Sequence, residues 1–126
     1  MKVLDADVVI AFLDDRDASH RRAVRLLTAV AADRDDLVIG AGAYAETLVH
    51  ATATGHARVV DAFLDDAGVS VLPVDRPTAR AAAALRARHR GLRLPDALSL
   101  ATALEHDAEL LTFDRRLLRV AAVEAV

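Results

Sequence analysis

Four acidic residues stand apart from the other charged side chains because of where they fall in the sequence. Two follow apolar runs that predict strands, and two lie at or near the start of expected helices: Asp5, Glu46, Asp96 and Asp114. In an open α/β sheet, ligands bind beyond the carboxyl ends of the strands. If the first and fourth predicted strands are neighbours, all four carboxylates could converge on one cleft.

Such a cluster points to metal-assisted phosphoryl chemistry. Unpaired carboxylates within a few ångströms of each other repel strongly in a low-dielectric site, and a hard divalent cation relieves that repulsion. An all-oxygen shell suits Mg²⁺ or Mn²⁺ rather than zinc. Because Mg²⁺ keeps several waters, it can present a nucleophilic water to a phosphodiester and neutralise the charge that develops on its oxygens. The constellation therefore best supports metal-dependent phosphoryl hydrolysis.

Each acid also has a plainer interpretation. Asp96 could only cap a helix. Glu46 could pair with His50 one turn later on the same helix, and Asp114 could simply start a turn. Asp5 ends an apolar run, where a buried acid is costly unless it has a purpose. The joint placement of the four residues, rather than any one of them, favours a functional site.

Two further residues are expected to support the acids. Asp7 lies two residues after Asp5 and is predicted to cap a helix over residues 8–13, beside the cleft. Thr112 lies two residues before Asp114 and could hydrogen-bond a carboxylate or a metal-bound water, although a strand threonine more often packs. The five histidines show no metal-ligand spacing on one predicted helix.

The segments between these positions predict alternating strands and helices. Short apolar runs predict strands at residues 3–4, 37–40, 69–74 and 109–112, with a possible fifth at 120–126. Periodic apolar stripes predict helices at residues 8–13, 19–31, 44–54, 56–67, 77–91 and from 95 onward. Strands that alternate with helices pair in parallel through right-handed crossovers. We therefore expect one three-layer α/β domain over residues 1–126, with a central parallel sheet of four to five strands flanked by helices.

Composition narrows the class of protein. The chain has 126 residues, of which 54% are hydrophobic, a net charge of −3 and no cysteine. The lack of cysteine argues against disulfides, thiolate zinc sites and cysteine nucleophiles. Acids interrupt the apolar residues at the N-terminus, and no segment approaches the roughly 20 apolar residues of a membrane span. We therefore expect a cytoplasmic protein with no membrane segment.

Four segments resemble the acidic motifs of PIN-domain nucleases, in the same order and over essentially the whole chain. They are VLDADVVIA at residues 3–11, AE at 45–46, LRLPDALSLATA at 92–103 and LTFD at 111–114. The last two segments are the most specific. The size of the chain most resembles that of the VapC toxins of prokaryotic toxin–antitoxin pairs. Asp7 departs from the pattern, because the family often has Ser, Thr or Asn at that position.

The resemblance implies a PIN fold and an endoribonuclease that depends on Mg²⁺ or Mn²⁺. It also implies a VapB-type antitoxin that occludes the site, a homodimer, and a structured RNA substrate such as tRNA or rRNA. Carried over residue by residue, Asp5 and Asp96 are the primary metal ligands. Asp114 completes the metal site directly or through water, and Glu46 orients or deprotonates the attacking water.

Arginine side chains near the last two acidic motifs are the expected contacts to RNA. They are Arg86, Arg90, Arg93 and Arg115. Arg86 and Arg90 are predicted to share one helix face, although a solvated face is the plainer interpretation for any one arginine. With three Phe, one Tyr and no Trp, the chain is poorly supplied for base stacking. Recognition is therefore expected through RNA shape and phosphate.

Three other functions stay open. A phosphatase of the haloacid-dehalogenase type fits the spacing of Asp5 and Asp7 at a strand end, and a response-regulator receiver fits the size and the acidic pocket. Both expect a later lysine, whereas the only lysine of this chain is Lys2. A PIN-like module that binds a partner without turnover would keep the same fold. Metal-dependent RNA cleavage by the purified chain separates these alternatives.

Overall fold

The computed structural model describes residues 1–125 and is built around a four-stranded parallel sheet. Its strands are β1 (Lys2–Leu4), β2 (Leu37–Gly40), β3 (Ser70–Leu72) and β4 (Glu109–Leu111). They lie side by side in the order β3-β2-β1-β4, and every pairing is parallel. The predicted parallel sheet is therefore confirmed, and β1 and β4 are neighbours as the convergence of the acids requires.

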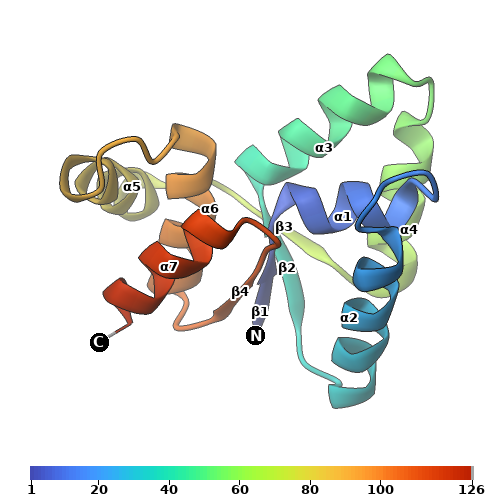
Figure 1. Ribbon diagram of the computed structural model, residues 1–126, viewed down its shortest axis with the longest axis horizontal. Helices are drawn as coiled ribbons and strands as arrows, with labels where there is room; N and C mark the ends of the chain where they lie inside the picture. The colour runs from blue at the N-terminus through green and yellow to red at the C-terminus, as the bar shows by residue number, and fades with distance from the viewer. Residues whose placement is uncertain (126) are drawn as a thin grey trace.

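Helices cover both faces of the sheet (Figure 1). On one face lie α1 (Ala6–Leu13), α2 (His20–Asp33), α3 (Ala41–Ala53) and α4 (Ala57–Ala67). On the other face lie α5 (Arg76–Arg88), α6 (Leu94–Glu105) and α7 (Arg115–Glu124). The molecule is thus the expected three-layer α/β structure.

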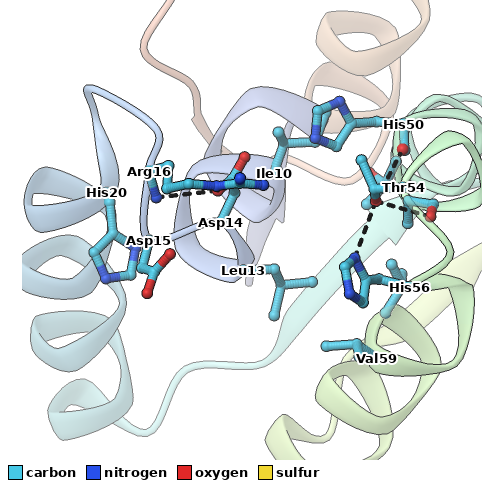
Figure 2. A pocket seen from close by; sticks show the side chains of 13 residues that line it. Ile10, Leu13, Asp14, Asp15, Arg16, His20, His50, Thr54, His56 and Val59 are labelled. Atoms are coloured by element: carbon cyan, nitrogen blue, oxygen red, sulfur yellow. Dashed lines mark hydrogen bonds and ion pairs between the residues drawn. The ribbon is translucent and has the colours of Figure 1, made fainter.

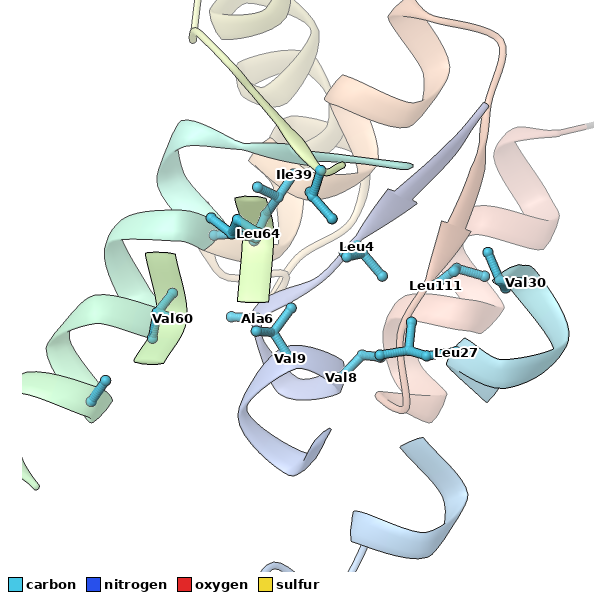
Figure 3. Packing of buried hydrophobic residues seen from close by; sticks show 13 residues of the cluster. Leu4, Ala6, Val8, Val9, Leu27, Val30, Ile39, Val60, Leu64 and Leu111 are labelled. Carbon is cyan, nitrogen blue, oxygen red and sulfur yellow. The ribbon is translucent and has the colours of Figure 1, made fainter. Parts of the chain in front are cut away.

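Alternate residues of the strands belong to two separate hydrophobic cores, because successive side chains of a strand point to opposite faces of the sheet. Leu4, Ile39 and Leu111 stand in register and pack under α1 to α4, as Figure 3 shows. Val3, Val38 and Leu110 are one residue earlier and pack under α5 to α7. Burial on both faces explains why the strands read as continuous apolar runs.

The predicted fifth strand at residues 120–126 is wrong. Residues up to Glu124 belong to α7, and Val126 lies outside the described residues. The side chain of Asp114 accepts hydrogen bonds from the backbone N–H groups of Arg116 and Leu117, which starts a helix. Leu117 then anchors that helix in the core. The β-branched residues near the C-terminus therefore continue a helix that a cap has already fixed.

The cap of the first helix also lies two residues before the predicted one. Asp5, not Asp7, is the N-cap of α1, and its Oδ1 accepts a hydrogen bond from the N–H of Ala6 at 3.0 Å. The helix therefore begins directly at the end of β1. Asp7 lies in its first turn, where its carboxylate is free to contact another segment.

The described part of the chain holds no helix long and apolar enough to cross a membrane.

Candidate active site

The acids gather where the strand order changes direction. From β1 the chain adds β2 and then β3 on one side, whereas β4 is added on the other side. Such a switch point is where open α/β sheets bind ligands, at the carboxyl ends of the strands. Asp5 follows β1, and the segment of residues 112–114 follows β4. The starts of α1 and α3 lie at this same edge (Figure 1).

Asp5 is the most firmly held acid of this edge. It is 8% exposed, and its carboxylate accepts hydrogen bonds from groups on three different elements. Ser99 Oγ of α6 donates to Oδ1 at 3.0 Å, and Thr112 Oγ1 donates to Oδ2 at 2.8 Å. Together with the N–H of Ala6, these donors fix the carboxylate in one orientation.

Asp7 lies next to Asp5 in a half-buried position. Its Oδ2 accepts a hydrogen bond from the N–H of Phe113 at 3.0 Å and lies 3.2 Å from Thr112 Oγ1. Burial, with a smaller contribution from the charge of Asp5, raises the pKa of Asp7 to about 6. The hydrogen bonds from Phe113 and Thr112 oppose that shift. Asp7 therefore ties α1 to the end of β4 beside the acids.

Glu46 of α3 and Asp96 of α6 complete the cluster. Burial is the largest cause that raises the pKa of Glu46, and the charges of Asp5 and Asp96 raise it further. Burial likewise raises the pKa of Asp96, whose ion pair with Arg93 at 3.4 Å opposes the shift. The pKa values of Glu46 and Asp96 therefore depend on the charges of acids that lie in other segments of the chain. The alternative ion pair between Glu46 and His50 does not form in residues 1–125.

Asp114 has both a structural contact and a place near the other acids. Its Oδ1 accepts from the backbone N–H groups of Arg116 at 2.9 Å and Leu117 at 3.1 Å. Its charge also contributes to the raised pKa of Asp96. The cap uses only Oδ1 of the carboxylate. Asp114 can therefore start α7 and still contribute to the acid cluster.

The arginines expected to bind RNA divide into two groups. Arg86 Nε donates to the carbonyl of Leu92 at 3.0 Å, and Arg93 pairs with Asp96. Arg90 lies beyond the end of α5, so it does not share a helix face with Arg86 as predicted. All four arginines are exposed. Arg86 therefore braces the loop that leads to Asp96.

A second basic surface was missed from the sequence. Arg22 and Arg25 of α2 line a groove of about 410 Å³ that runs along β4 toward Phe113 and Leu118. The guanidinium of Arg22 lies 4.4 Å from the centroid of the Phe113 ring, a cation–π contact. The only signal in the sequence was the arginine-rich start of α2, and nothing local indicated that it packs beside the last acidic motif.

A deeper cavity lies away from the acids, between α1, α3, α4 and the α1–α2 loop (Figure 2). Its volume is about 410 Å³. Polar side chains of its wall include His20, His50, His56, Asp14 and Asp15, whereas its apolar side chains come mainly from α1 and α4. Its wall therefore combines polar and apolar side chains from α1, α3, α4 and the α1–α2 loop.

With this geometry in place, comparisons with known proteins identify the family. The sequence model of the PIN domain matches residues 2–123. The chain belongs to the PIN-domain family. The resemblance seen in the acidic motifs is thereby confirmed, and the PIN domain takes in all of the acids of the cluster. No curated protein sequence matches the chain significantly.

Solved structures share the PIN fold. A toxin–antitoxin complex from Klebsiella pneumoniae is 25% identical, with a TM-score of 0.73 over 89% of this chain and 85% of that one. VapC20 of Mycobacterium tuberculosis, described as a sarcin–ricin loop cleaving toxin, is 21% identical, with a TM-score of 0.80 over 94% of both chains. VapBC2 from Rickettsia felis, bound to a DNA fragment from its promoter, is 17% identical, with a TM-score of 0.68 over 94% of this chain and 92% of that one.

PIN-domain nucleases generally use divalent metal ions, and the donor set of this PIN domain suits one kind of ion. In residues 1–125, no three His, Asp or Glu side chains stand close enough together to hold an ion directly. Mg²⁺, however, keeps most of its waters and is bound by only one or two carboxylates together with substrate phosphates. The facing carboxylates therefore fit a water-rich ion rather than a closed protein cage.

Proposed function

We propose that the protein is the toxin of a type II toxin–antitoxin pair and acts as a metal-dependent endoribonuclease. The observation that carries this proposal is the buried Asp5 carboxylate, fixed at the switch point of the sheet, whose charge contributes to the raised pKa values of Glu46 and Asp96. The toxin–antitoxin complex that is 25% identical over most of the chain supports the toxin role. The sarcin–ricin loop cleaving toxin with the same fold supports RNA as the substrate.

Each acid has a role in the proposed reaction. Asp5 and Asp96 would hold Mg²⁺ or Mn²⁺, and Asp114 would complete the site through water. When bound, the ion supplies Lewis-acid stabilisation of the phosphate and a more acidic water. Glu46 is the most exposed of the facing acids, so it is the group that can reach a substrate-side water and accept its proton. Asp7 and Thr112 hold the end of β4 against Asp5.

RNA would be held by arginines on both sides of the acids. Arg90, Arg93 and Arg115 flank the cluster on the α5–α6 and α7 sides, and the groove of Arg22 and Arg25 adds a rim on the α2 side. Contacts to phosphate fix an RNA in register without reading its bases. A structured RNA such as tRNA or rRNA, recognised by shape, is the substrate class that we propose.

Partners are proposed in two hollows, one away from the acid cluster and one that Glu46 also lines. A VapB-type antitoxin would occupy the cavity between α1, α3 and α4 (Figure 2), because its mixture of apolar and charged side chains suits a peptide segment. A homodimer would use the hollow of about 550 Å³ between α3 and α6, where Val49 is 72% exposed. Both partners would act in the cytoplasm.

The phosphatase and receiver alternatives lose support in the structure. Both need a lysine near the acids, but Lys2 lies at the amino end of β1, where its Nζ contacts Glu109 at 2.6 Å and Asp35 at 3.5 Å. The remaining alternative is a PIN domain that binds RNA or an antitoxin without cleaving RNA.

Cleavage of total cellular RNA by the purified, antitoxin-free chain tests the proposal. We expect cleavage in Mn²⁺ or Mg²⁺, none after chelation with EDTA, and none by Asp5→Asn in either ion. Asp35→Asn is the matched control, because it removes an acid from the opposite end of the sheet, where Asp35 pairs with Lys2. RNA binding without cleavage by the wild-type chain in both ions would favour the silent binding module instead.

A further inference from the structure

Two buried hydroxyl groups on α6 have different partners. Ser99 and Thr102 are each 4% exposed. Thr102 Oγ1 donates to the carbonyl of Leu98 at 2.8 Å, which is the usual way for a hydroxyl in the middle of a helix to be satisfied. Ser99 Oγ instead donates across the molecule to Asp5 Oδ1 at 3.0 Å. The helix therefore directs one hydroxyl to its own backbone and the other to the acid cluster.

The acceptor capacity of the Asp5 carboxylate shows what Ser99 does there. An ionised carboxylate has two oxygens with about four lone-pair positions. Oδ1 accepts from the N–H of Ala6 and from Ser99, both at 3.0 Å, so both of its positions are filled. Oδ2 accepts from Thr112 at 2.8 Å and keeps one position. Asp5 therefore has one oxygen left with which to approach a cation.

We infer that Ser99 is a positioning residue. Its hydroxyl occupies the second acceptor position of Asp5 Oδ1, so that Asp5 binds a cation through Oδ2 alone. This inference rests on the proposed function, because it requires an ion at Asp5. Mg²⁺ takes single oxygens in strict octahedral geometry, whereas Ca²⁺ accepts a carboxylate through both oxygens. Ser99 thus favours Mg²⁺ or Mn²⁺ over Ca²⁺ at this site.

The variant that tests this role changes little else. Ser99→Ala removes one oxygen atom from the interior of α6 and introduces the best helix former, so the fold is expected to persist. Asp5 would keep the bonds from Ala6 and Thr112 but would gain an open position on Oδ1. Ser99→Cys is a second variant of similar volume with a much weaker donor. Thr102→Val is the matched control, because it removes the other buried hydroxyl of the same helix.

Competition between Ca²⁺ and Mn²⁺ on the full chain measures the effect without any turnover. Electron paramagnetic resonance of free Mn²⁺ gives the Mn²⁺ affinity, and added Ca²⁺ gives the ratio of the two affinities. Since partners of metal ligands typically change metal affinity by about 10- to 100-fold, we expect Ser99→Ala to shift the ratio about 10-fold toward Ca²⁺. Ser99→Cys should shift it in the same direction, and Thr102→Val should leave it as in the wild type.

Two results would overturn the inference while the proposed function stands. One is an unchanged ratio in Ser99→Ala and Ser99→Cys, with Mn²⁺ binding that Asp5→Asn abolishes. The other is an equal shift in Thr102→Val, which would mean that packing in α6, rather than the bond to Asp5, sets the ratio. A wild-type chain whose Mn²⁺ binding is absent or indifferent to Asp5→Asn would instead overturn the proposed metal site itself, and the inference with it.

Discussion

Acidic side chains at the two ends of the sheet differ in the partners that the protein provides for them. At the amino end, Lys2 lies between Glu109 and Asp35, with Nζ–O distances of 2.6 and 3.5 Å. At the carboxyl end, Asp5 and Asp7 have hydroxyl and N–H partners but no ion pair in the described residues, and Asp96 has only Arg93. The protein supplies a cation for the acids at one end and leaves an excess of negative charge at the other.

Protonation equilibria follow the same division. The hydrogen bond with Glu109 raises the pKa of Lys2, which keeps the pair charged. Burial raises the pKa values of Asp7, Glu46 and Asp96 at the other end, so their charged forms are disfavoured. Carboxylates whose pKa values are raised in this way are typical of functional sites. The difference suggests that the missing cation at the carboxyl end comes from outside the chain.

The largest effect that separates the two ends is expected from Asp96→Asn. Removal of a metal-facing charge should lower RNA cleavage by at least about a thousandfold, roughly 4 kcal/mol of transition-state stabilisation, with no loss of fold. Single-turnover cleavage rates and circular dichroism measure the two properties. Asp35→Asn at the amino end should keep the wild-type rate, and a comparable loss in that variant would mean that the ends do not differ.

A smaller effect is expected from Asp7→Asn in the absence of metal. The folded pKa of about 6 exceeds the unfolded value, so the stability associated with Asp7 is fully present below pH 4 and is lost as the pH rises through about 6. The variant removes that loss. It should be more stable than the wild type by about 1–2 kcal/mol at pH 7, after allowance for solvent screening, and nearly equal at pH 4.

Chemical denaturation at both pH values, in the presence of EDTA, measures this difference. A stability gain that is the same at pH 4 and pH 7 would show that burial of the Asp7 charge is not its source.

A weaker effect on substrate binding is expected from Arg25→Ala. Loss of one phosphate contact should raise KM for RNA about fivefold, with kcat unchanged, and should reduce the salt dependence of binding by about one unit of slope. Arg58→Ala on α4 is the matched control, because it removes an exposed arginine away from this groove. Steady-state kinetics over a range of salt concentrations distinguish the variants, and equal behaviour of the two would assign the α2 groove to solvent.

The smallest effect is expected from Lys2→Met at the amino end. Its partners are exposed, and exposed ion pairs contribute little, so the free energy of unfolding should change by less than about 0.5 kcal/mol. Cleavage should keep its wild-type rate. A loss of activity in this variant, measured beside the thermal melt, would contradict the assignment of chemistry to the carboxyl end alone.

Much of the fold could be predicted because its signals are local. The apolar runs that contain Val3 and Val38 predicted buried parallel strands, and the acids that follow two of the strands predicted where a site would form. The prediction of a strand at residues 120–126 is wrong because β-branched residues favour strands, whereas the side chain of Asp114 caps a helix there. Asp5 and Asp7 are equally good caps on spacing alone, so the sequence does not show which of them begins the helix.

The contacts that the sequence did not reveal are those between distant segments. Ser99 reaches Asp5 across 94 positions of the chain, and nothing in the helical pattern around Ser99 distinguishes it from Thr102. Arg86 is similar, since its bond to the Leu92 carbonyl depends on the path of a loop. Such contacts follow from packing, which local patterns of residues do not encode.

The location of a bound Mn²⁺ ion tests the central claim most directly. Anomalous diffraction from crystals soaked in Mn²⁺ should show a peak at the carboxyl end of the sheet, within coordination distance of Asp5 Oδ2 and beside Asp96. The peak should vanish in Asp5→Asn crystals. A peak at the Glu109 and Asp35 end, or none within reach of Asp5, would contradict the claim that these acids share a metal ion.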